Sequence, residues 1–271
     1  MPELPEVETT RRGIETSVTG RTIAALTVRD RRLRWPIPRG LEQTLAGQRI
    51  TGVGRRGKYL LIYCARGALI LHLGMSGSLR VLAPATPVGK HDHFDLLLNS
   101  GLALRFNDPR RFGSLHWTAA NPADHKLLRD IGPEPLEPGF DAEYLHRSSR
   151  RRKVALKNFV MNGHVVVGVG NIYASESLFR ARLRPGRRAS SLSRRDAGQL
   201  VRAVKTVLGQ AIRVGGTTLR DYVGADGNPG YFRQKLFVYE RAGCPCRVCR
   251  TSIRRVTHGQ RSTYYCPKCQ K

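Results

Sequence analysis

Two pairs of cysteines near the C-terminus constrain the fold of this chain more than any other feature. Cys246 pairs with Cys249 and Cys266 with Cys269, each across two residues, and sixteen residues separate the pairs. Four thiolates at this spacing can surround one ion tetrahedrally, the geometry that Zn²⁺ prefers. Because protein ligands fill all four positions, we predict one structural Zn²⁺ with no catalytic role. The cysteine-rich tail, residues 236–271, is too short to bury much apolar core, so the metal supplies most of its folding free energy.

The other two cysteines have separate interpretations. Cys244 lies two residues before Cys246 and could replace it as a ligand, although a C-x-C start fits the knuckle turn less well. Cys64 stands in an apolar run, where a small buried hydrophobic residue is the favoured interpretation. Five of the six cysteines lie between positions 244 and 269, which indicates a metal site and not a disulfide framework.

The charge of the chain restricts its partners. Lys and Arg number 47 against 20 Asp and Glu, which gives a formal net charge of +27. Residues 141–271 carry 27 basic and 7 acidic side chains, a net +20, against +7 for residues 1–140. Such a surface binds polyanions, and nucleic acid is the leading candidate. An Arg-rich proteome is the alternative source of this excess.

The sequence has no membrane or export signal. No apolar run approaches the roughly 18 residues of a membrane helix, and the opening MPELPEVETTRR lacks the apolar region of a signal peptide. We therefore expect a cytoplasmic protein without a membrane partner.

Residues 1–118 predict an N-terminal helix followed by a β-sandwich. Pro5 suits a first helical turn, and a partial apolar stripe runs through residues 5–18. Runs rich in β-forming residues follow, separated by Gly, Pro and Asn, and many short strands at this spacing suggest a sandwich or a barrel. These runs are Thr22–Val28, Lys58–Cys64, Ala68–Leu73, His93–Leu98, Leu102–Phe106 and Gly113–Trp117.

The second half of the chain changes to a helical period. Residues 119–140 contain four prolines and are predicted to be a linker. A helical domain over 141–235 and a zinc module over 236–271 complete an α+β multidomain architecture. The candidate helices are 141–148, 153–162, 173–181 and 193–213, and the Gly-rich stretch 215–230 is predicted to be a mobile loop.

The opening PELPEVE permits an unusual chemistry. Removal of Met1 would expose Pro2 as a secondary amine, and with a pKa of about 8 a useful fraction is neutral near pH 7. Attack of that amine on an aldehyde-level carbon gives a cationic iminium, an electron sink that acidifies the neighbouring C–H. Glu3 beside it can transfer protons. On these residues alone, a helix start with a first-turn acid is the favoured interpretation.

The chain as a whole resembles the formamidopyrimidine-DNA glycosylases, bacterial base-excision enzymes for oxidised purines. The similarity runs from end to end in the family's order, and the set is far more specific than any single motif. The matching stretches are PELPEVETTRRG, RRGKYLL, HLGMSGSLR, KHDHFDL, NDPRRFG, GVGNIYASESLF, GGTTLRDY, GYFRQKLFVYER and GQRSTYYCPKCQK.

The resemblance implies a fold and a set of catalytic residues. The expected fold is an N-terminal helix plus β-sandwich, a helical domain with a helix–two-turns–helix element, and a C-terminal β-hairpin zinc finger. Pro2 matches the nucleophile that attacks the anomeric carbon and forms a Schiff base, before β- and δ-elimination cut the strand. Glu3 matches the acid that assists base loss, Lys58 a catalytic lysine near the lesion, and Arg261 a residue linked to δ-elimination.

The resemblance also implies contacts with double-stranded DNA. Apolar wedges and an Arg that enter the base stack offset the cost of extruding a base. Met75, Arg110 and Phe112 match this void-filling set. Phosphate contacts are implied for His72, His91, Arg110, Arg152, Asn171 and Arg261. Weaker matches to the lesion pocket are Glu6, Glu176, Thr217 and Tyr222.

Two alternative functions stay open at this point. An endonuclease VIII-like glycosylase would act on oxidised pyrimidines, but typically lacks the PELPEVE opening and the void-filling set. A non-catalytic, zinc-containing nucleic-acid-binding protein would explain the charge and the cysteines, but not Pro2, Glu3 and Lys58 together. We expect a monomer that acts on oxidised or abasic DNA.

Overall fold

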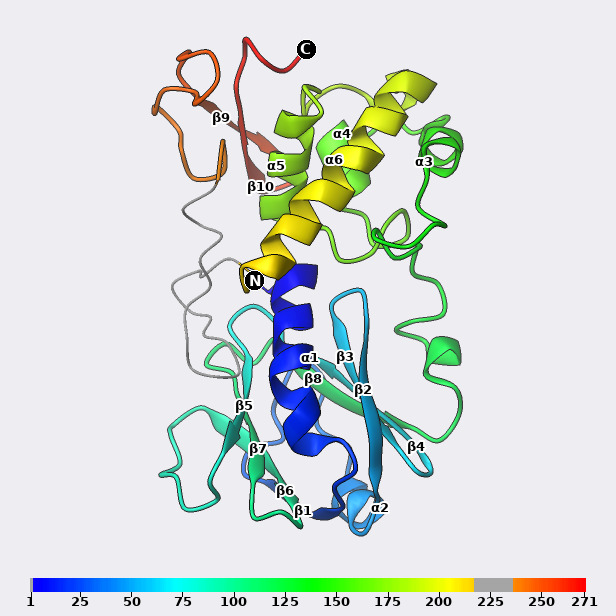
Figure 1. Cartoon of the computed structure of the whole chain (residues 1–271), viewed down its shortest axis with the longest axis vertical. Coiled ribbons are helices and arrows are strands. Elements are labelled where there is room, and N and C mark those ends of the chain that lie inside the picture. Colours follow the sequence, from blue (N-terminus) through cyan, green and yellow to red (C-terminus); the bar gives the residue numbers. More distant parts are fainter. Residues whose placement is uncertain (1, 217–235) are drawn as a thin grey trace. The chain divides into compact units, whose positions relative to one another are not determined.

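A computed structural model describes residues 2–216 and 236–271 of the protein. The described chain divides into two compact units (Figure 1). The first unit contains residues 2–129 and 214–216, and the second contains residues 130–213 and 236–271. The stretch 217–235, which includes most of the predicted mobile loop together with Thr217 and Tyr222, lies outside the described residues. No helix among the described residues has both the length and the apolarity to cross a membrane.

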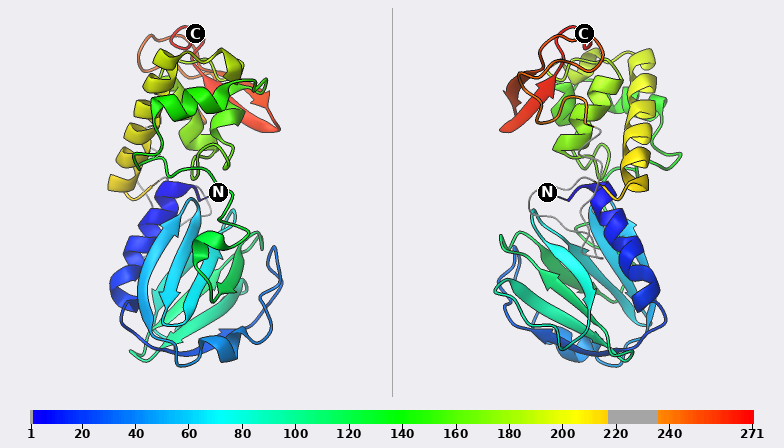
Figure 2. Two further views of the ribbon diagram at one scale, coloured as in Figure 1. Left: turned by 90° about the vertical axis from the view of Figure 1, so that its right-hand side faces the viewer. Right: turned by 60° about the vertical axis from the view of Figure 1, so that its left-hand side comes forward.

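The first unit is a β-sandwich of two antiparallel four-stranded sheets (Figure 2). One sheet has the order β1 (Ile23–Val28), β6 (Asp92–Leu98), β7 (Ala103–Asn107) and β5 (Ser78–Leu82). The other has the order β2 (Ile50–Arg56), β3 (Tyr59–Cys64), β4 (Gly67–His72) and β8 (Ser114–Thr118). Their inner faces share one apolar core with buried residues such as Leu60, Phe94 and Phe106. The predicted sandwich is therefore confirmed.

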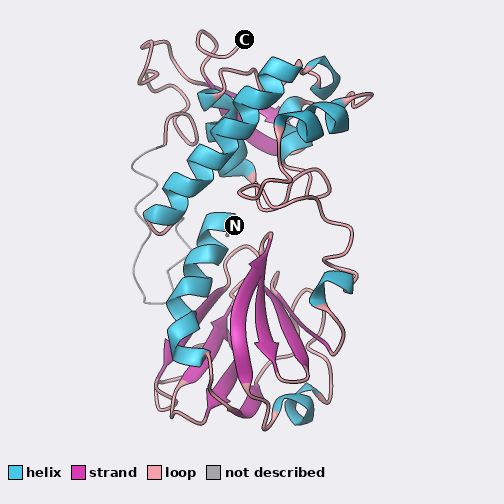
Figure 3. Cartoon of the chain, turned by 45° about the vertical axis from the view of Figure 1, so that its right-hand side comes forward, coloured by secondary structure: helices cyan, strands magenta, loops and turns pink. Residues whose placement is uncertain are grey.

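Helix α1 (Leu4–Val18) packs against β2 beside the sandwich (Figure 3). Its buried residues Val7, Ile14 and Val18 join the core, as the apolar stripe predicts. A short helix α2 (Leu41–Leu45), which the sequence does not predict, packs against β1. The 3₁₀ turn η1 (Pro122–Asp124) lies in the predicted linker and contacts β4.

The second unit combines helices with a β-hairpin. Its helices are α3 (Ala142–Ser149), α4 (Leu156–Val160), α5 (Asn171–Arg180) and α6 (Arg194–Arg213), with a 3₁₀ turn η2 (Ala189–Ser191). The long amphipathic α6 packs against α3 and α5. Strands β9 (Arg254–His258) and β10 (Arg261–Tyr265) form the hairpin, and β10 packs against α5. The cysteine-rich tail thus shares a compact unit with the helices.

Candidate active site and nucleic-acid interface

The N-terminus of α1 places Pro2 and Glu3 at a capping box. The backbone N–H of Glu3, the N-cap residue, donates to Glu6 Oε2 at 2.9 Å, and the Glu3 side chain faces the backbone of Glu6 in return. Both carboxylates are almost fully buried. The interpretation of Glu3 as a helix-start acid is therefore correct for the fold, and a chemical role would be additional. Glu6 also lies close to Gly216, where a Cβ would stand 2.9 Å from Glu6 Oε1.

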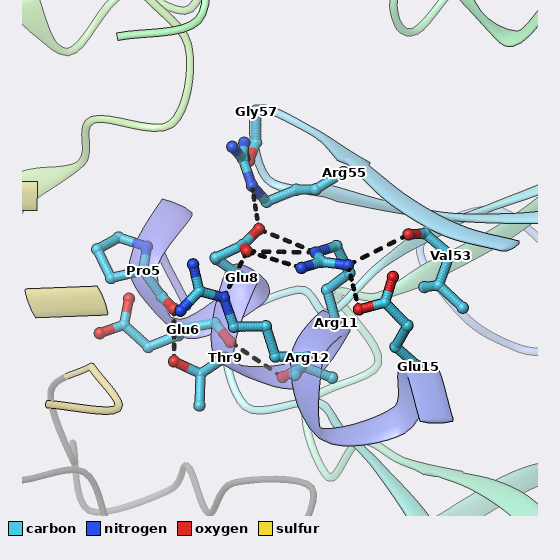
Figure 4. Close-up of polar contacts among 11 residues, drawn as sticks. Pro5, Glu6, Glu8, Thr9, Arg11, Arg12, Glu15, Val53, Arg55 and Gly57 are labelled. Atoms are coloured by element: carbon cyan, nitrogen blue, oxygen red, sulfur yellow. Dashed lines mark hydrogen bonds and ion pairs between the residues drawn. The ribbon is translucent and has the colours of Figure 1, made fainter. Parts of the chain in front are cut away.

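Glu8, further along α1, connects this helix through Arg55 to Gly57 in the β2–β3 turn (Figure 4). Its carboxylate accepts from Arg12 Nε at 2.8 Å, from Arg11 at 3.1 Å and from Arg55 Nε at 3.2 Å. Arg55 in turn donates from Nη1 to the carbonyl of Gly57 at 2.9 Å. Lys58 follows Gly57 directly, so one buried carboxylate ties the helix that begins after Glu3 to the β2–β3 turn.

Replacing Glu8 with glutamine should lower the free energy of unfolding at pH 7 by about 2 kcal/mol. Burial acts to raise the Glu8 pKa, but hydrogen bonds and charge from its arginines outweigh it, and the pKa lies below its usual value. The wild-type advantage is therefore present above the unfolded pKa and is lost as the pH falls through the lower, folded pKa. Urea unfolding at pH 7 and at low pH measures both effects.

Glu15→Gln is the control for this comparison. Glu15 also pairs with Arg11, at 2.8 Å, but its side chain is 43% exposed, so its loss should cost less than about 0.5 kcal/mol. Equal losses in the two variants would show that the buried connection to Arg55 adds nothing.

His72, at the end of β4, is held in one tautomer. Its Nδ1 accepts the backbone N–H of Gly74 at 3.0 Å, so the proton of the neutral ring is on Nε2. The Tyr59 ring packs on it with a centroid distance of 4.9 Å. Burial, with the charges of Lys58 and Arg34, lowers the His72 pKa to about 4. His72 is therefore a neutral donor at physiological pH, which suits a contact with a phosphate oxygen.

The titration of His72 is a second expected result. NMR should show its imidazole neutral at pH 6, with a midpoint near 4. Because the unfolded state takes up this proton near pH 6.5, the unfolding free energy should fall by about 2–3 kcal/mol between pH 6.5 and 4. His72→Asn should remove this part of the pH dependence. A midpoint near 6.5 in the folded protein would contradict the assignment.

The three predicted void-filling residues lie on two neighbouring loops of the first unit. Met75 is partly buried in the loop between β4 and β5, whereas Arg110 and Phe112 are exposed between β7 and β8. The Arg110 guanidinium carbon stands 5.2 Å from the centroid of the Phe112 ring, and Phe112 is 43% exposed. His91 is partly buried just before β6, and its carbonyl accepts the N–H of Asp108 at 3.0 Å.

In the second unit, Lys157 orients the predicted phosphate ligand Asn171. The fully buried Lys157 Nζ donates to Asn171 Oδ1 at 2.5 Å, to the Ser262 carbonyl at 2.8 Å and to Thr263 Oγ1 at 2.9 Å. Since an ammonium group only donates, the Asn171 amide must turn its oxygen to Lys157 and its NH₂ away. Asn171 is also the first residue of α5, and the N-terminus of a helix favours anions.

The other predicted residues of this unit are distributed over its surface and interior. Arg152 is exposed in the turn after α3, and Arg261 is exposed at the first position of β10. Lys157 links the strand that begins at Arg261 to α5, a connection that the sequence reasoning missed. A lysine that follows two apolar residues, Ala-Leu-Lys at 155–157, is the only local signal for it.

Glu176 has a structural role that the sequence does not predict, and its lesion contact stays a prediction. Its buried carboxylate accepts the backbone N–H groups of Phe237 at 2.9 Å, Val238 at 3.0 Å and Tyr239 at 2.9 Å. Burial raises the pKa of Glu176, although these three hydrogen bonds and Arg247 act to lower it. The carboxylate anchors the segment that leads into the cysteine-rich tail against α5. Nothing in the local sequence indicates these backbone partners.

The four predicted ligand cysteines converge. The Sγ atoms of Cys246, Cys249, Cys266 and Cys269 all lie within 4.8 Å of one another. Two Sγ pairs are 3.9 and 3.4 Å apart, close to the roughly 3.8 Å between corners of a tetrahedron with Zn–S bonds of about 2.3 Å. Backbone N–H groups of Val248 and Cys269 point at Cys246 and Cys266 Sγ, each at 3.4 Å. The donor set fits a structural Zn²⁺, and the exposed Cys244 is outside it.

Comparison with known proteins identifies the family. Three family models match in order: the formamidopyrimidine-DNA glycosylase N-terminal domain over residues 1–115, the H2TH domain of that glycosylase over 131–223, and a zinc finger found in FPG and IleRS over 243–271. A formamidopyrimidine-DNA glycosylase from Thioalkalivibrio sulfidiphilus is 57% identical over 271 residues, all of both chains. The chain belongs to the formamidopyrimidine-DNA glycosylase family.

Solved structures of the family agree along the whole chain. The Thermus thermophilus MutM (Fpg) protein is 39% identical with a TM-score of 0.89, over 99% of this chain and 98% of that one. A Lactococcus lactis Fpg mutant in complex with Fapy-dG-containing DNA is 31% identical with a TM-score of 0.93, over all of both chains. Lactococcus lactis Fpg in complex with abasic-site DNA is 30% identical with a TM-score of 0.91, over 99% of this chain and 99% of that one. The predicted formamidopyrimidine-DNA glycosylase fold and its zinc finger are confirmed.

Family membership also decides between the predicted functions. The chain is a formamidopyrimidine-DNA glycosylase, an enzyme that excises oxidised purines and has AP lyase activity. Lactococcus lactis relatives bind Fapy-dG-containing and abasic-site DNA. The pyrimidine-specific and non-catalytic alternatives are not supported, because full-length relatives carry the formamidopyrimidine-DNA glycosylase name.

Proposed function

We propose that Pro2 is the nucleophile with which this enzyme excises oxidised purines such as 8-oxoguanine and formamidopyrimidines. The observation that carries the proposal is the full-length family match of a chain that opens Pro2-Glu3 at the start of a helix. The Lactococcus lactis relatives bind Fapy-dG and abasic-site DNA, the substrate and intermediate classes that this chemistry requires.

The proposed reaction begins when removal of Met1 frees the Pro2 amine. The amine attacks the anomeric carbon, the bond to the damaged base breaks, and the sugar ring opens to give an iminium linked to Pro2. Glu3 supplies and removes the protons of base loss and ring opening. The iminium acidifies the adjacent C–H, so β-elimination and then δ-elimination release the two phosphates.

The other proposed residues bind the DNA. Lys58 supplies a cation near the lesion, and the neutral Nε2–H of His72 donates to a phosphate. His91, Arg110, Arg152, Asn171 and Arg261 are the remaining phosphate contacts, and Arg261 also assists δ-elimination. Met75, Arg110 and Phe112 fill the space that the extruded nucleotide leaves.

We propose fewer residues for the lesion pocket than the sequence suggests. Glu6 stays in it as a candidate, and Thr217 and Tyr222 stay candidates outside the described residues. Glu176 is better explained as an anchor, since its carboxylate accepts three backbone N–H groups. We also propose that the enzyme is a monomer and acts in the bacterial cytoplasm, where the DNA is.

Borohydride trapping tests the proposal. Reduction of the iminium should link the enzyme covalently to a duplex with 8-oxoguanine, and peptide mapping should place the link on Pro2. Protein that retains Met1, or whose N-terminus is blocked, should give no adduct. An adduct that survives the block would place the nucleophile elsewhere. Faster excision of thymine glycol than of 8-oxoguanine would favour a pyrimidine enzyme.

A further inference from the structure

Two loops of the first unit, which carry the three void-filling residues, contact each other through their backbones. The β4–β5 loop, residues 73–77, carries Met75, and the β7–β8 loop, residues 108–113, carries Arg110 and Phe112. Gly74 has a φ of +70°, and a Cβ there would lie 2.4 Å from the backbone nitrogen of Gly113. The same Cβ would lie 2.5 Å from the carbonyl carbon of Phe112. The two backbones are therefore in direct contact, and no side chain separates them.

A single buried carboxylate joins the loops at this contact. Asp108 is fully buried, and its Oδ1 accepts the Ser76 hydroxyl at 2.8 Å. Its Oδ2 accepts the backbone N–H of Gly113 at 2.8 Å, and the N–H of Arg110 approaches Oδ1 at 3.3 Å. Oδ1 thus accepts from both loops, and Oδ2 accepts from the second loop only.

The backbone of Asp108 is fixed as firmly as its side chain. Its carbonyl accepts His93 Nε2 at 2.9 Å and the N–H of Arg111 at 3.3 Å. Arg111 has a φ of 58° and pairs with Asp30 at 3.0 Å, which holds this tight turn between Arg110 and Phe112. A buried carboxylate with this many donors is satisfied only while both loops keep their places.

We propose that Asp108 is a positioning residue that holds loops 73–77 and 108–113 as one rigid wedge. The inference rests on the proposed void-filling role of Met75, Arg110 and Phe112. The wedge is assembled before DNA arrives, so its three side chains enter the duplex without a further ordering cost. That benefit is largest when a stacked, paired base must leave, and smaller at an abasic site, which has no base to extrude.

The test compares Ser76→Ala with Ser114→Ala on two duplexes. Ser114 is buried next to Gly113, and its hydroxyl has no hydrogen-bond partner among the described residues, so it is a matched control. In single-turnover assays, Ser76→Ala should excise 8-oxoguanine opposite cytosine about tenfold more slowly, and cleave a preformed abasic site less than about twofold more slowly. Ser114→Ala should match the wild type on both. Asp108→Asn has one acceptor oxygen in place of two. It should slow 8-oxoguanine excision more than Ser76→Ala does, and again slow it more than abasic-site cleavage.

The outcomes distinguish the rigid wedge from the void-filling role on which it rests. Equal losses of Ser76→Ala on both duplexes would reduce Asp108 to a structural role and overturn the wedge. Met75→Ala and Phe112→Ala test the void-filling role itself. If they slow excision and Ser76→Ala does not, the wedge is wrong and the proposed function stands. If neither slows excision, the void-filling assignment fails. Should Asp108→Asn not fold, the Ser76 and Ser114 pair still decides.

Discussion

Replacing Glu3 with glutamine should abolish base excision while leaving DNA binding nearly intact. Loss of general acid–base catalysis typically costs a factor of ~10²–10⁴. The choice of glutamine matters because Glu3 is also the N-cap of α1 and half of a capping box with Glu6. A glutamine carbonyl can still accept the helix N–H, so the helix start is kept and only proton transfer is lost. Single-turnover excision of 8-oxoguanine and a binding titration measure the two effects.

The capping box supplies the control for this result. Glu3→Ala removes cap and acid together, so its unfolding free energy should fall by about 1 kcal/mol, which Glu3→Gln should not show. Excision by Glu3→Gln at the wild-type rate would mean that another group is the acid.

Replacing Cys249 with serine should release the zinc and disorder the hairpin of the second unit. Structural zinc contributes on the order of 10 kcal/mol of apparent binding free energy, more than a small module can lose. Among the residues that the structure describes, the core of the β-sandwich has no member in common with the cysteine cluster, so the sandwich should stay folded. Zinc content measures the release of the metal, and near-UV circular dichroism reports on the folding of the hairpin and the sandwich. DNA affinity should fall as well, because the hairpin carries Arg261.

Two further substitutions show what the zinc is for. Cys244→Ser should keep the metal, because Cys244 is outside the cluster. Arg261→Ala should keep the metal and weaken binding to many sequences alike, with a salt slope smaller by about one. We expect the zinc module to present Arg261, the first residue of β10, to a backbone phosphate. Zinc-free protein that bound and cleaved lesion DNA like the holo form would contradict this role.

The sequence predicts most elements that alternate or repeat cleanly. It misses strand β2, where glycines interrupt the pattern, and the short elements β5 and α2. Strand β2 contains Gly52 and Gly54, residues depleted in strands, and ends in two arginines. The structure gives Gly54 a reason: a Cβ there would lie 2.8 Å from the Tyr63 ring, so the glycine makes room for an aromatic side chain of β3. Such a cross-strand requirement is invisible before the pairing is known.

Some residues of the candidate site can likewise be predicted from the sequence, and others cannot. The cysteine spacing predicts the metal cluster from sequence because the ligands carry the chemistry themselves. The positioning residues Asp108, Lys157 and Glu176 act through partners far away in sequence or through backbone groups. The neighbours of Asp108 and Glu176 in the chain give no sign of this, and for Lys157 the only local signal is the two apolar residues before it. The motif NDPRRFG contains Asp108, yet only the fold brings Ser76 to it.

The pairing of carboxylates inside each unit has a consequence for how the enzyme finds its target. Glu8, Asp95 and Asp196 are held against arginines at short range. Paired charges of this kind contribute little beyond a Debye length of about 8–10 Å, so DNA meets mainly the surplus cations. Sequence-independent attraction of this type lets a protein slide and hop along a duplex. We therefore expect the enzyme to scan many undamaged base pairs in each encounter, and added salt to shorten each scan.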